Sequence, residues 1–190
     1  MAIRITAPLS EETIASLKSG DRVLISGTVY TARDAAHKRM TEQLEQGREL
    51  PFDIRNQVIY YVGPTPAKQG MVIGSAGPTT SGRMDKYAPK LMELGLKGMI
   101  GKGYRNADVR EAIVRHKAVY FAAIGGSGAL LSRTVKSVEL VAYEDLGPEA
   151  IRKLAIEDFP AVVINDIHGN DLYESGVQNY RIQSDSDSAH

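Results

Sequence analysis

The sequence predicts one mixed α/β domain built in layers, long enough to bury a proper hydrophobic core. Apolar runs of strand length alternate with amphipathic runs of helix length after residue 70, whereas the first part of the chain is richer in strands. The composition agrees, because 18 glycines and few aromatic residues (9 Tyr, 3 Phe and no Trp) suit a Gly-looped α/β domain. We expect the domain to cover residues 1–182 and the polar tail 183–190 to be disordered.

Helices are predicted where apolar residues recur every three or four positions between capping residues and Gly or Pro stops. Ser10 opens the first of these segments, and Gly20 follows its end. In the second, Met40 and its apolar neighbours fall on one side, while the charged residues face away. The predicted helices cover residues 10–17, 34–46, 83–94, 107–116, 129–135 and 148–156.

Strands are predicted where short runs rich in β-branched and aromatic residues end at Gly or Pro. The clearest run is Gln-Val-Ile-Tyr-Tyr-Val over residues 57–62, which Gly63 and Pro64 close. The predicted strands cover residues 22–30, 57–62, 71–74, 97–101, 118–124, 138–143 and 161–165.

The charge balance and the missing cysteines restrict the function classes. Acidic and basic residues number 23 each, so the net charge favours neither nucleic acid nor an anionic membrane as a partner. No apolar stretch approaches a membrane span, and residues 1–6 lack the apolar core of a signal peptide. The absence of cysteine excludes a disulfide scaffold and fits a reducing compartment. We therefore expect a cytoplasmic protein without a membrane or nucleic-acid partner.

The segment 76–85, Ala-Gly-Pro-Thr-Thr-Ser-Gly-Arg-Met-Asp, is the strongest candidate for a binding site. It brings hydroxyls, free backbone N–H groups and the Arg83 guanidinium to the start of a predicted helix, where an anion is favoured. It is not a P-loop, because the Gly-Lys-Ser/Thr ending is missing. The alternative is that Thr80 or Ser81 merely caps the helix and Arg83 is solvated.

A second candidate lies where the predicted strand 22–30 meets the helix that follows it. Arg33 precedes the first helical turn, His37 follows four residues later on about the same face, and Asp34 is a competent N-cap. The alternative is a capped helix whose Arg and His side chains are on the surface.

Two further candidates are glycine-flanked. Lys102 stands between two glycines at the end of a predicted strand, where it would supply a point charge. Gly125 and Gly126 follow another predicted strand, where they could cradle an anion or permit tight packing.

These candidates share a topology, because each follows a strand and ligands of α/β sheets collect at strand ends. The cations Arg33, Arg83 and Lys102 have no acidic partner that the sequence identifies. Their convergence with Thr79 predicts a site for a small molecule that carries more than one carboxylate.

Several motifs occur together and in order along nearly the whole chain, from about residue 5 to about residue 181. They are Gly20-Asp21 with Ser26-Gly27-Thr28, Arg33-Asp34-Ala35-Ala36-His37-Lys38-Arg39, Ile59-Tyr60-Tyr61-Val62-Gly63-Pro64, Gly77-Pro78-Thr79-Thr80 with Arg83-Met84-Asp85, Met99-Ile100-Gly101-Lys102-Gly103, and Gly125-Gly126. With these motifs the chain resembles the iron–sulfur hydro-lyases, specifically the β subunit or carboxy-terminal domain of class I fumarase. The paralogous L-tartrate dehydratase β subunit is close behind.

The resemblance implies a swivelling β/β/α domain that closes over a substrate held by a separate α subunit or amino-terminal domain. In the family that partner supplies three cysteines to a 4Fe–4S cluster, so the cluster would be ligated by the partner and not by this chain. On the matching positions, Arg33, Arg83 and Lys102 would bind the substrate carboxylates, and Thr79 would take the carbon-bound proton of malate. Thr80 would belong to the substrate site with Gly125 and Gly126, and it is the alternative to Thr79 as the base.

The resulting expectation is the β subunit of a two-subunit fumarase that interconverts fumarate and (S)-malate and is active only with its α subunit. The motifs 33–37 and 59–64 look fumarase-like and favour this substrate over tartrate. A non-catalytic dicarboxylate-binding module is the second alternative, and a stand-alone hydratase without a cofactor is the third. We also expect that the isolated chain could self-associate as a homodimer through the face meant for the α subunit.

Overall fold

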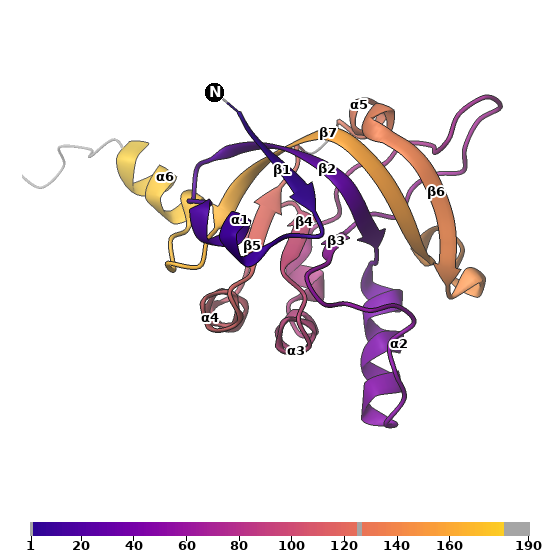
Figure 1. The fold of residues 1–190 in the computed structure, drawn as a ribbon, viewed down its shortest axis with the longest axis horizontal. Coiled ribbons are helices and arrows are strands. Elements are labelled where there is room, and N and C mark those ends of the chain that lie inside the picture. The colour runs from indigo at the N-terminus through magenta and orange to yellow at the C-terminus, as the bar shows by residue number, and fades with distance from the viewer. Residues whose placement is uncertain (1, 125–126, 181–190) are drawn as a thin grey trace, which may run out of the picture.

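The computed structural model describes residues 2–124 and 127–180, and over these ranges it is a mixed α/β domain around one seven-stranded sheet (Figure 1). The strand order is β1-β2-β3-β4-β5-β7-β6. The strands are β1 (Ile3–Ala7), β2 (Arg22–Thr31), β3 (Val58–Tyr60), β4 (Gly98–Gly101), β5 (Val119–Ala122), β6 (Val135–Ala142) and β7 (Ile151–Asn165).

The long strand β7 folds the sheet back on itself. Strands β1 to β5 pair in parallel with their neighbours, whereas β7 is antiparallel to β5, to β6 and also to β2. The additional β2–β7 pairing closes β2, β3, β4, β5 and β7 into a ring. The carboxyl ends of β2 to β5 therefore lie next to one another along one edge.

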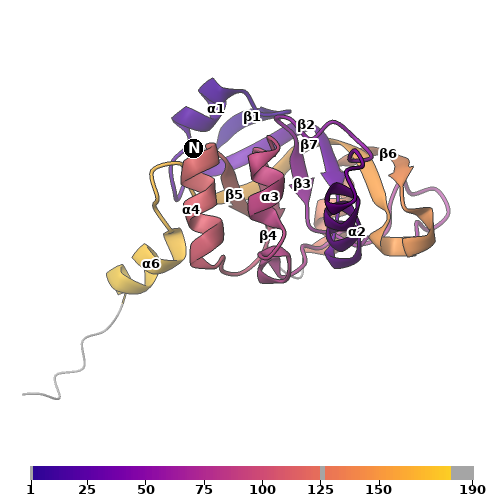
Figure 2. The same ribbon diagram turned by 90° about the horizontal axis from the view of Figure 1, so that it is seen from below.

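Three helices cover the outer face of β3, β4 and β5. Figures 1 and 2 show α2, α3 and α4 side by side below these strands, whereas β1, β2 and β7 lie above them. The helical elements are α1 (Glu11–Ser16), α2 (Asp34–Glu45), η1 (Ser81–Met84), α3 (Ala88–Glu93), α4 (Ala107–His116), α5 (Gly128–Leu131), η2 (Ser132–Thr134), η3 (Glu144–Glu149) and α6 (Leu172–Tyr180). None of the helices in the two described ranges is long and apolar enough to cross a membrane.

Two separate apolar cores account for the layers. Along β3, Val58 and Tyr60 belong to one core, which lies between the strands of the ring. Ile59 and the following Tyr61 belong to the other, which lies between the strands and the covering helices. Because successive side chains of a strand point to opposite faces, this short run can serve both cores, and its fully apolar sequence reflects that burial. The expected α/β class is confirmed, while the β/β/α arrangement and its swivelling motion stay predictions.

Most predicted elements are present, and their ends follow local capping chemistry. The Ser10 hydroxyl accepts a hydrogen bond from the Thr13 N–H at 3.1 Å, which starts α1. Asn106 does the same for α4, accepting from the Val109 N–H at 2.9 Å. The predicted helices 10–17, 34–46 and 107–116 and the predicted strands 22–30, 57–62, 97–101, 118–124 and 138–143 are each confirmed in position, with shifts of up to three residues at their ends. The predicted strand 161–165 is only the last part of β7, which begins ten residues earlier, at Ile151.

The predicted helix 148–156 is wrong, because residues from Ile151 onward form the first part of β7. The local sequence is rich in helix-forming Ala, Leu, Lys and Arg. Its backbone instead pairs with β2 on one side and with β6 on the other. These ladders join residues far apart in the chain, and they override the local helix propensity.

Three other predictions need correction. Residues 71–74 form no strand and lie in a loop, whose base is closed by the Thr65 N–H donating to the Ser75 carbonyl at 3.0 Å. The predicted helix 83–94 is divided into η1 and α3, because Pro89 fits only the first turn of a helix. The predicted helix 129–135 ends early, as α5 and η2, and β6 starts at Val135.

Strand β1 and helix α6 were not predicted from the sequence. The predicted disordered tail 183–190 lies outside the described residues, as do Gly125 and Gly126.

Candidate functional site

The candidate site lies at the edge where β2, β3, β4 and β5 end. Arg33 follows the end of β2, and Lys102 follows the end of β4. Thr79 reaches the same edge because its N–H donates to the Tyr61 carbonyl at 2.7 Å and its carbonyl accepts from the Lys102 N–H at 3.2 Å. The structure therefore brings together loops that are separated by up to 70 residues in the sequence, as their positions after parallel strands predict.

Thr79 and Thr80 run alongside Lys102 like a short extra strand. Thr80 forms a parallel bridge with Lys102, and the Ser81 N–H donates to the Lys102 carbonyl at 2.8 Å. Thr79 is half-buried, whereas Thr80 and Lys102 are exposed. Among the described residues, the Thr79 hydroxyl has no hydrogen-bond partner and the Lys102 ammonium has no ion-pair partner. Both groups are thus available to a ligand.

The two arginines meet at Asp34. Arg83 Nε lies 2.8 Å from Asp34 Oδ1, and Arg33 Nε lies 3.8 Å from Asp34 Oδ2. Arg33 Nη2 also lies 3.3 Å from Glu149 Oε1. The expectation that the cations have no acidic partner is therefore wrong for both arginines, because Asp34 is their neighbour in space and Glu149 arrives from η3, far along the chain.

This cluster retains unused hydrogen-bonding capacity. Within the described part of the chain, Arg33 Nε and Asp34 Oδ2 are buried atoms without a hydrogen-bond partner. Buried polar atoms are normally paired with protein, water or ligand. The Arg33 side chain is 23% exposed and that of Arg83 is 51% exposed, so a small anion can reach both from solvent.

The simple capping alternatives are not supported. Arg33, not Asp34, occupies the N-cap position of α2, so the prediction for Asp34 is wrong and its carboxylate lies in the first turn instead. Thr80 is at the N-cap position of η1 but makes no side-chain capping bond. Ser81 Oγ instead lies 2.9 Å from the Tyr120 hydroxyl. A Cβ on Gly101 would come within 1.9 Å of Ser81 Oγ. Gly101 therefore makes room for Ser81.

The expected cradle of free N–H groups at a helix start is also only partly present. Segment η1 is a short 3-10 helix of four residues, and its first N–H is used by the Lys102 carbonyl. The anion-binding capacity of this segment thus rests on its side chains, Thr79, Thr80 and Arg83.

His37 is buried beneath the site, which corrects the alternative that it is a surface residue. Its Nδ1–H donates to the Arg33 carbonyl at 2.9 Å, and its ring packs against Tyr61 and Tyr87. Burial lowers the pKa of His37 to about 4, so the imidazole is neutral near pH 7. His37 thus supports the backbone of Arg33.

A buried ion pair that the sequence did not indicate joins two loops of the site. Arg105 Nε lies 2.6 Å from Asp85 Oδ1, and the Asn106 N–H donates to Asp85 Oδ2 at 2.7 Å. The Arg105 guanidinium also lies over the rings of Tyr61 and Tyr120. The pair ties the segment carrying Thr79 and Arg83 to the loop that follows Lys102. The one signal that could have suggested it was the unexplained carboxylate at the end of the 76–85 motif.

The loop after β5 reaches the same segment. The Ala76 N–H donates to the Gly128 carbonyl at 3.1 Å. Gly125 and Gly126, which were predicted to belong to the substrate site, lie outside the described residues, so their role stays a prediction.

The chain provides no thiolate ligand for an iron–sulfur cluster. It has no cysteine. Among residues 2–124 and 127–180, no three His, Asp or Glu side chains are grouped so that they could hold a metal ion. Thiolate ligands for a cluster would have to come from another polypeptide or another part of a longer one.

Comparison with known proteins gives a consistent picture. The sequence model of the family described as "Fumarase C-terminus" matches residues 1–176. The chain is 40% identical over 172 residues to "Fumarate hydratase class I, aerobic" of Escherichia coli (strain K12), covering 90% of this chain and 30% of that protein. It is 40% identical over 156 residues to "Fumarate hydratase 2" of Leishmania major, covering 81% of this chain and 28% of that protein.

One relative is close to this chain in length and is named for a different activity. The chain is 38% identical over 172 residues to "Putative L(+)-tartrate dehydratase subunit beta" of Methanocaldococcus jannaschii, covering 87% of this chain and 88% of that protein. The chain thus spans about 30% of the fumarate hydratases and nearly all of the tartrate dehydratase subunit.

Proposed function

Because this chain belongs to the fumarase C-terminus family, we propose that it is the β subunit of a two-subunit hydro-lyase that interconverts fumarate and (S)-malate. The observation that carries the proposal is the gathering of Arg33, Arg83, Lys102 and Thr79 at one sheet edge. The site of such an enzyme needs cations for two carboxylates and a group that moves a proton, and these four residues supply both.

Arg33 and Arg83 serve as the carboxylate clamp. Guanidinium groups suit carboxylates because they offer paired N–H donors in a plane. Both guanidinium groups lie next to the Asp34 carboxylate, which brings them close to each other. Removing a proton next to a carboxylate builds negative charge on it, and fixed cations stabilise that charge more strongly than the ground state.

Thr79 serves as the base in the direction from malate to fumarate, in which a proton leaves one carbon and hydroxide leaves its neighbour. A Thr hydroxyl is a weak base in water, so this role depends on nearby positive charge. Lys102 is the candidate for that charge, since its backbone is hydrogen-bonded to Thr79. Thr80 remains the alternative base, because it lies at the same bridge.

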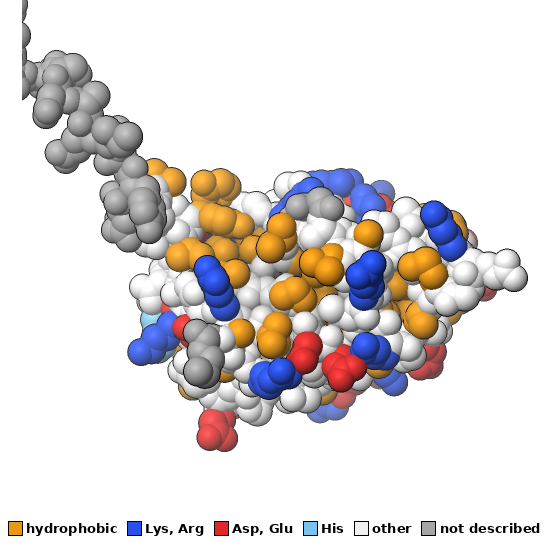
Figure 3. All heavy atoms as spheres, turned by 90° about the horizontal axis from the view of Figure 1, so that it is seen from above, with side chains coloured by type: hydrophobic (Ala, Val, Ile, Leu, Met, Phe, Trp, Pro, Cys, Tyr) orange, Lys and Arg blue, Asp and Glu red, His pale blue; other side chains and the backbone are white. Residues whose placement is uncertain are grey.

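The α subunit completes the enzyme and holds the 4Fe–4S cluster. The absence of cysteine supports this division of roles. So does the name "subunit beta" of the Methanocaldococcus jannaschii relative, of which the chain covers 88%. Exposed apolar side chains support a partner chain too, since such side chains often pack in an interface. They include Met71, Val72, Ile124, Leu130 and Leu140. Figure 3 shows apolar side chains gathered on the face opposite α2 to α4.

A second candidate function is the β subunit of an L-tartrate dehydratase. The observation that favours it is the 88% coverage of the Methanocaldococcus jannaschii protein, against 30% for the Escherichia coli fumarate hydratase. Both substrates are four-carbon dicarboxylates, so the same cationic clamp would serve either.

The test is to produce the chain together with its α subunit, assemble the cluster without oxygen, and assay fumarate, malate and tartrate separately. We expect turnover of fumarate and malate by the complex and none by this chain alone. Preferential turnover of tartrate would select the second candidate. Turnover by this chain alone in the absence of iron would contradict the proposal.

The Thr79→Ala and Thr80→Ala variants of the same complex identify the base. Because general base catalysis contributes about 100- to 10,000-fold, we expect Thr79→Ala to lower kcat by that amount. Thr80→Ala serves as the matched control and should retain most of the turnover. The reverse order would move the role of the base to Thr80.

A further inference from the structure

Glu149 is a charged side chain of the site edge to which neither the sequence nor the proposed reaction gives a role. We propose that Glu149 is a positioning residue, which holds the Arg33 guanidinium in the orientation that binds the substrate carboxylate. The inference rests on the proposed function, because it concerns the carboxylate clamp of that reaction.

The Glu149 carboxylate contacts both the side chain of Arg33 and the start of α2, the helix that follows Arg33. Its Oε1 lies 3.3 Å from Arg33 Nη2, and its Oε2 accepts a hydrogen bond from the Ala35 N–H at 3.0 Å. The second bond occupies a free N–H of the first turn of α2, where negative charge is also favoured. One carboxylate thus fixes the guanidinium relative to the backbone from which it extends.

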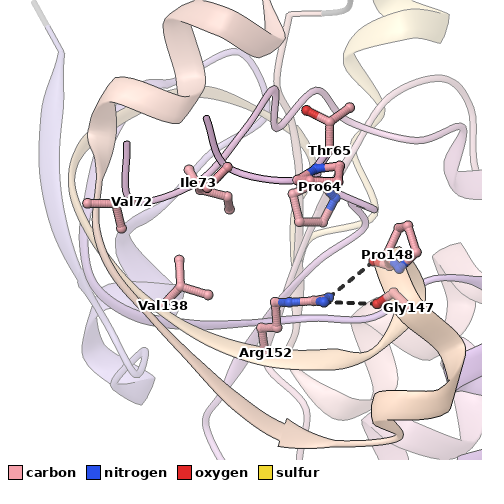
Figure 4. A pocket seen from close by; sticks show the side chains of 10 residues that line it. Pro64, Thr65, Val72, Ile73, Val138, Gly147, Pro148 and Arg152 are labelled. Atoms are coloured by element: carbon pink, nitrogen blue, oxygen red, sulfur yellow. Dashed lines mark hydrogen bonds between the residues drawn. The ribbon is translucent and has the colours of Figure 1, made fainter. Parts of the chain in front are cut away.

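Glu149 is itself held in place by the end of β2. The Thr31 hydroxyl donates to the Ala150 carbonyl at 3.2 Å and accepts from the Arg152 N–H at 3.0 Å. The Arg152 guanidinium donates to the Gly147 carbonyl at 2.9 Å and to the Pro148 carbonyl at 3.3 Å, as Figure 4 shows. The backbone on both sides of Glu149 is therefore fixed, and its carboxylate is preorganised.

The Arg33 guanidinium also has a neighbour in the loop after β3. A Cβ at Gly63 would lie 2.7 Å from Arg33 Nη1, so the guanidinium packs against the backbone of the loop after β3. With Glu149 and Gly63 both next to the guanidinium, few rotamers remain for Arg33. A clamp with its side chain already ordered binds its ligand at a smaller entropic cost.

A second ion pair between the same two elements provides a matched control. Arg39 of α2 pairs with Asp145 of η3, with Arg39 Nη1 2.7 Å from Asp145 Oδ1. This pair joins the same helix to the same segment, but it has no contact with Arg33 or Arg83 in the described structure. Substituting this pair shows whether Glu149 acts only by attaching η3 to α2 or specifically by orienting Arg33.

The experiment is a double-mutant cycle on the assembled complex, with Glu149→Gln, Arg33→Ala, the double variant and Asp145→Asn. Because small displacements of a positioned group are costly, we expect Glu149→Gln to lower kcat/KM about tenfold. In the Arg33→Ala background the same substitution should lower it no further, because Glu149 acts through Arg33. Asp145→Asn should leave kcat/KM unchanged.

Three outcomes would overturn the inference. The first is an unchanged kcat/KM in Glu149→Gln, and the second is an equal loss in the wild-type and Arg33→Ala backgrounds. The third is a lower KM in Glu149→Gln, which would show that Glu149 competes with the substrate for Arg33.

A second readout separates failure of the inference from failure of the proposed function. If the unsubstituted complex turns over neither fumarate nor tartrate, the proposed function is wrong. The inference is then tested by NMR of the Arg33 Nε–H group in the full chain, assigned with Arg33→Lys. We expect an ordered Nε–H signal that becomes mobile in Glu149→Gln and not in Asp145→Asn. An equally ordered signal in all three proteins would overturn it.

Discussion

Arg105 and Arg33 both lie in loops that follow parallel strands, but their guanidinium groups differ in burial and in the contacts that they make within the chain. Arg105 is buried, and its nitrogens contact the Asp85 carboxylate, the Met99 sulfur and the Tyr61 hydroxyl. Arg33 is partly exposed, and its Nε lacks a hydrogen-bond partner within the described residues. Arg105 therefore stabilises the fold, whereas Arg33 retains a hydrogen-bond donor that a ligand could use.

The energetics of the two arginines should differ in the same way. Breaking a buried ion pair leaves an uncompensated charge in a medium of low polarity, whereas a partly exposed pair is stabilised by water when its partner is lost. Substitutions of Arg105 should therefore appear in the free energy of unfolding, and substitutions of Arg33 in turnover.

The largest effect is expected for Arg105→Met. This substitution leaves the Asp85 carboxylate buried without its partner, so we expect the free energy of unfolding to fall by about 3–5 kcal/mol. Urea unfolding followed by circular dichroism measures it. The double variant Arg105→Met with Asp85→Leu should recover part of the loss. A loss near zero for Arg105→Met would show that Arg105 has no structural role.

The next largest effect is a pH dependence of the free energy of unfolding. It comes from His37, which is buried beneath the site. Its pKa is about 4 in the folded chain, because of burial, against the ordinary value of 6.5. Between these pH values the unfolded chain binds a proton at His37 that the folded chain does not, so the free energy of unfolding falls as the pH falls. The contribution is complete above pH 6.5. We expect a loss of about 3 kcal/mol between pH 7 and pH 4.

The measurement is the difference between wild type and His37→Asn in urea unfolding across that pH range. The Asn amide can still donate to the Arg33 carbonyl but does not titrate. The variant should show a shallower dependence on pH. Identical slopes in the two proteins would mean that His37 titrates normally and is not buried as described.

For Arg33→Ala we expect a small change in the free energy of unfolding but a large loss of turnover in the assembled complex. Loss of one contact to developing charge lowers turnover about 100-fold or more, and Arg83→Ala should act similarly. The urea midpoint of the free chain should change little, because Arg33 is partly exposed. Near-normal kinetics would remove the residue from the site, and a large loss of stability would make Arg33 another structural arginine.

The smallest effect is expected for Arg39→Met, which removes the exposed ion pair with Asp145. Neither turnover nor the urea midpoint should change measurably. Arg39 is a suitable control, because it lies in α2, the helix that begins directly after Arg33, and pairs with a different acidic residue of η3. A kinetic loss as large as that of Arg33→Ala would show that attachment of η3, not the guanidinium of Arg33, controls turnover.

Elements with local signals could be predicted from the sequence alone. The cap at Asn106 and the apolar periodicity that follows it place α4, because both act within one or two helical turns. Likewise, Arg33, Thr79 and Lys102 could be selected because each stands in a loop that the local pattern places after a strand or a short apolar run.

Strand pairings, ion pairs and burial that involve distant parts of the chain could be seen only in the tertiary structure. The segment after Ile151 became a strand because its backbone pairs with β2, more than 100 residues earlier in the chain. The contact of Glu149 with Arg33 and the burial of Arg105 arise in the same way, from side chains that the fold brings together. Local propensities amount to less than about 1 kcal/mol per residue, so long-range pairing and burial override them.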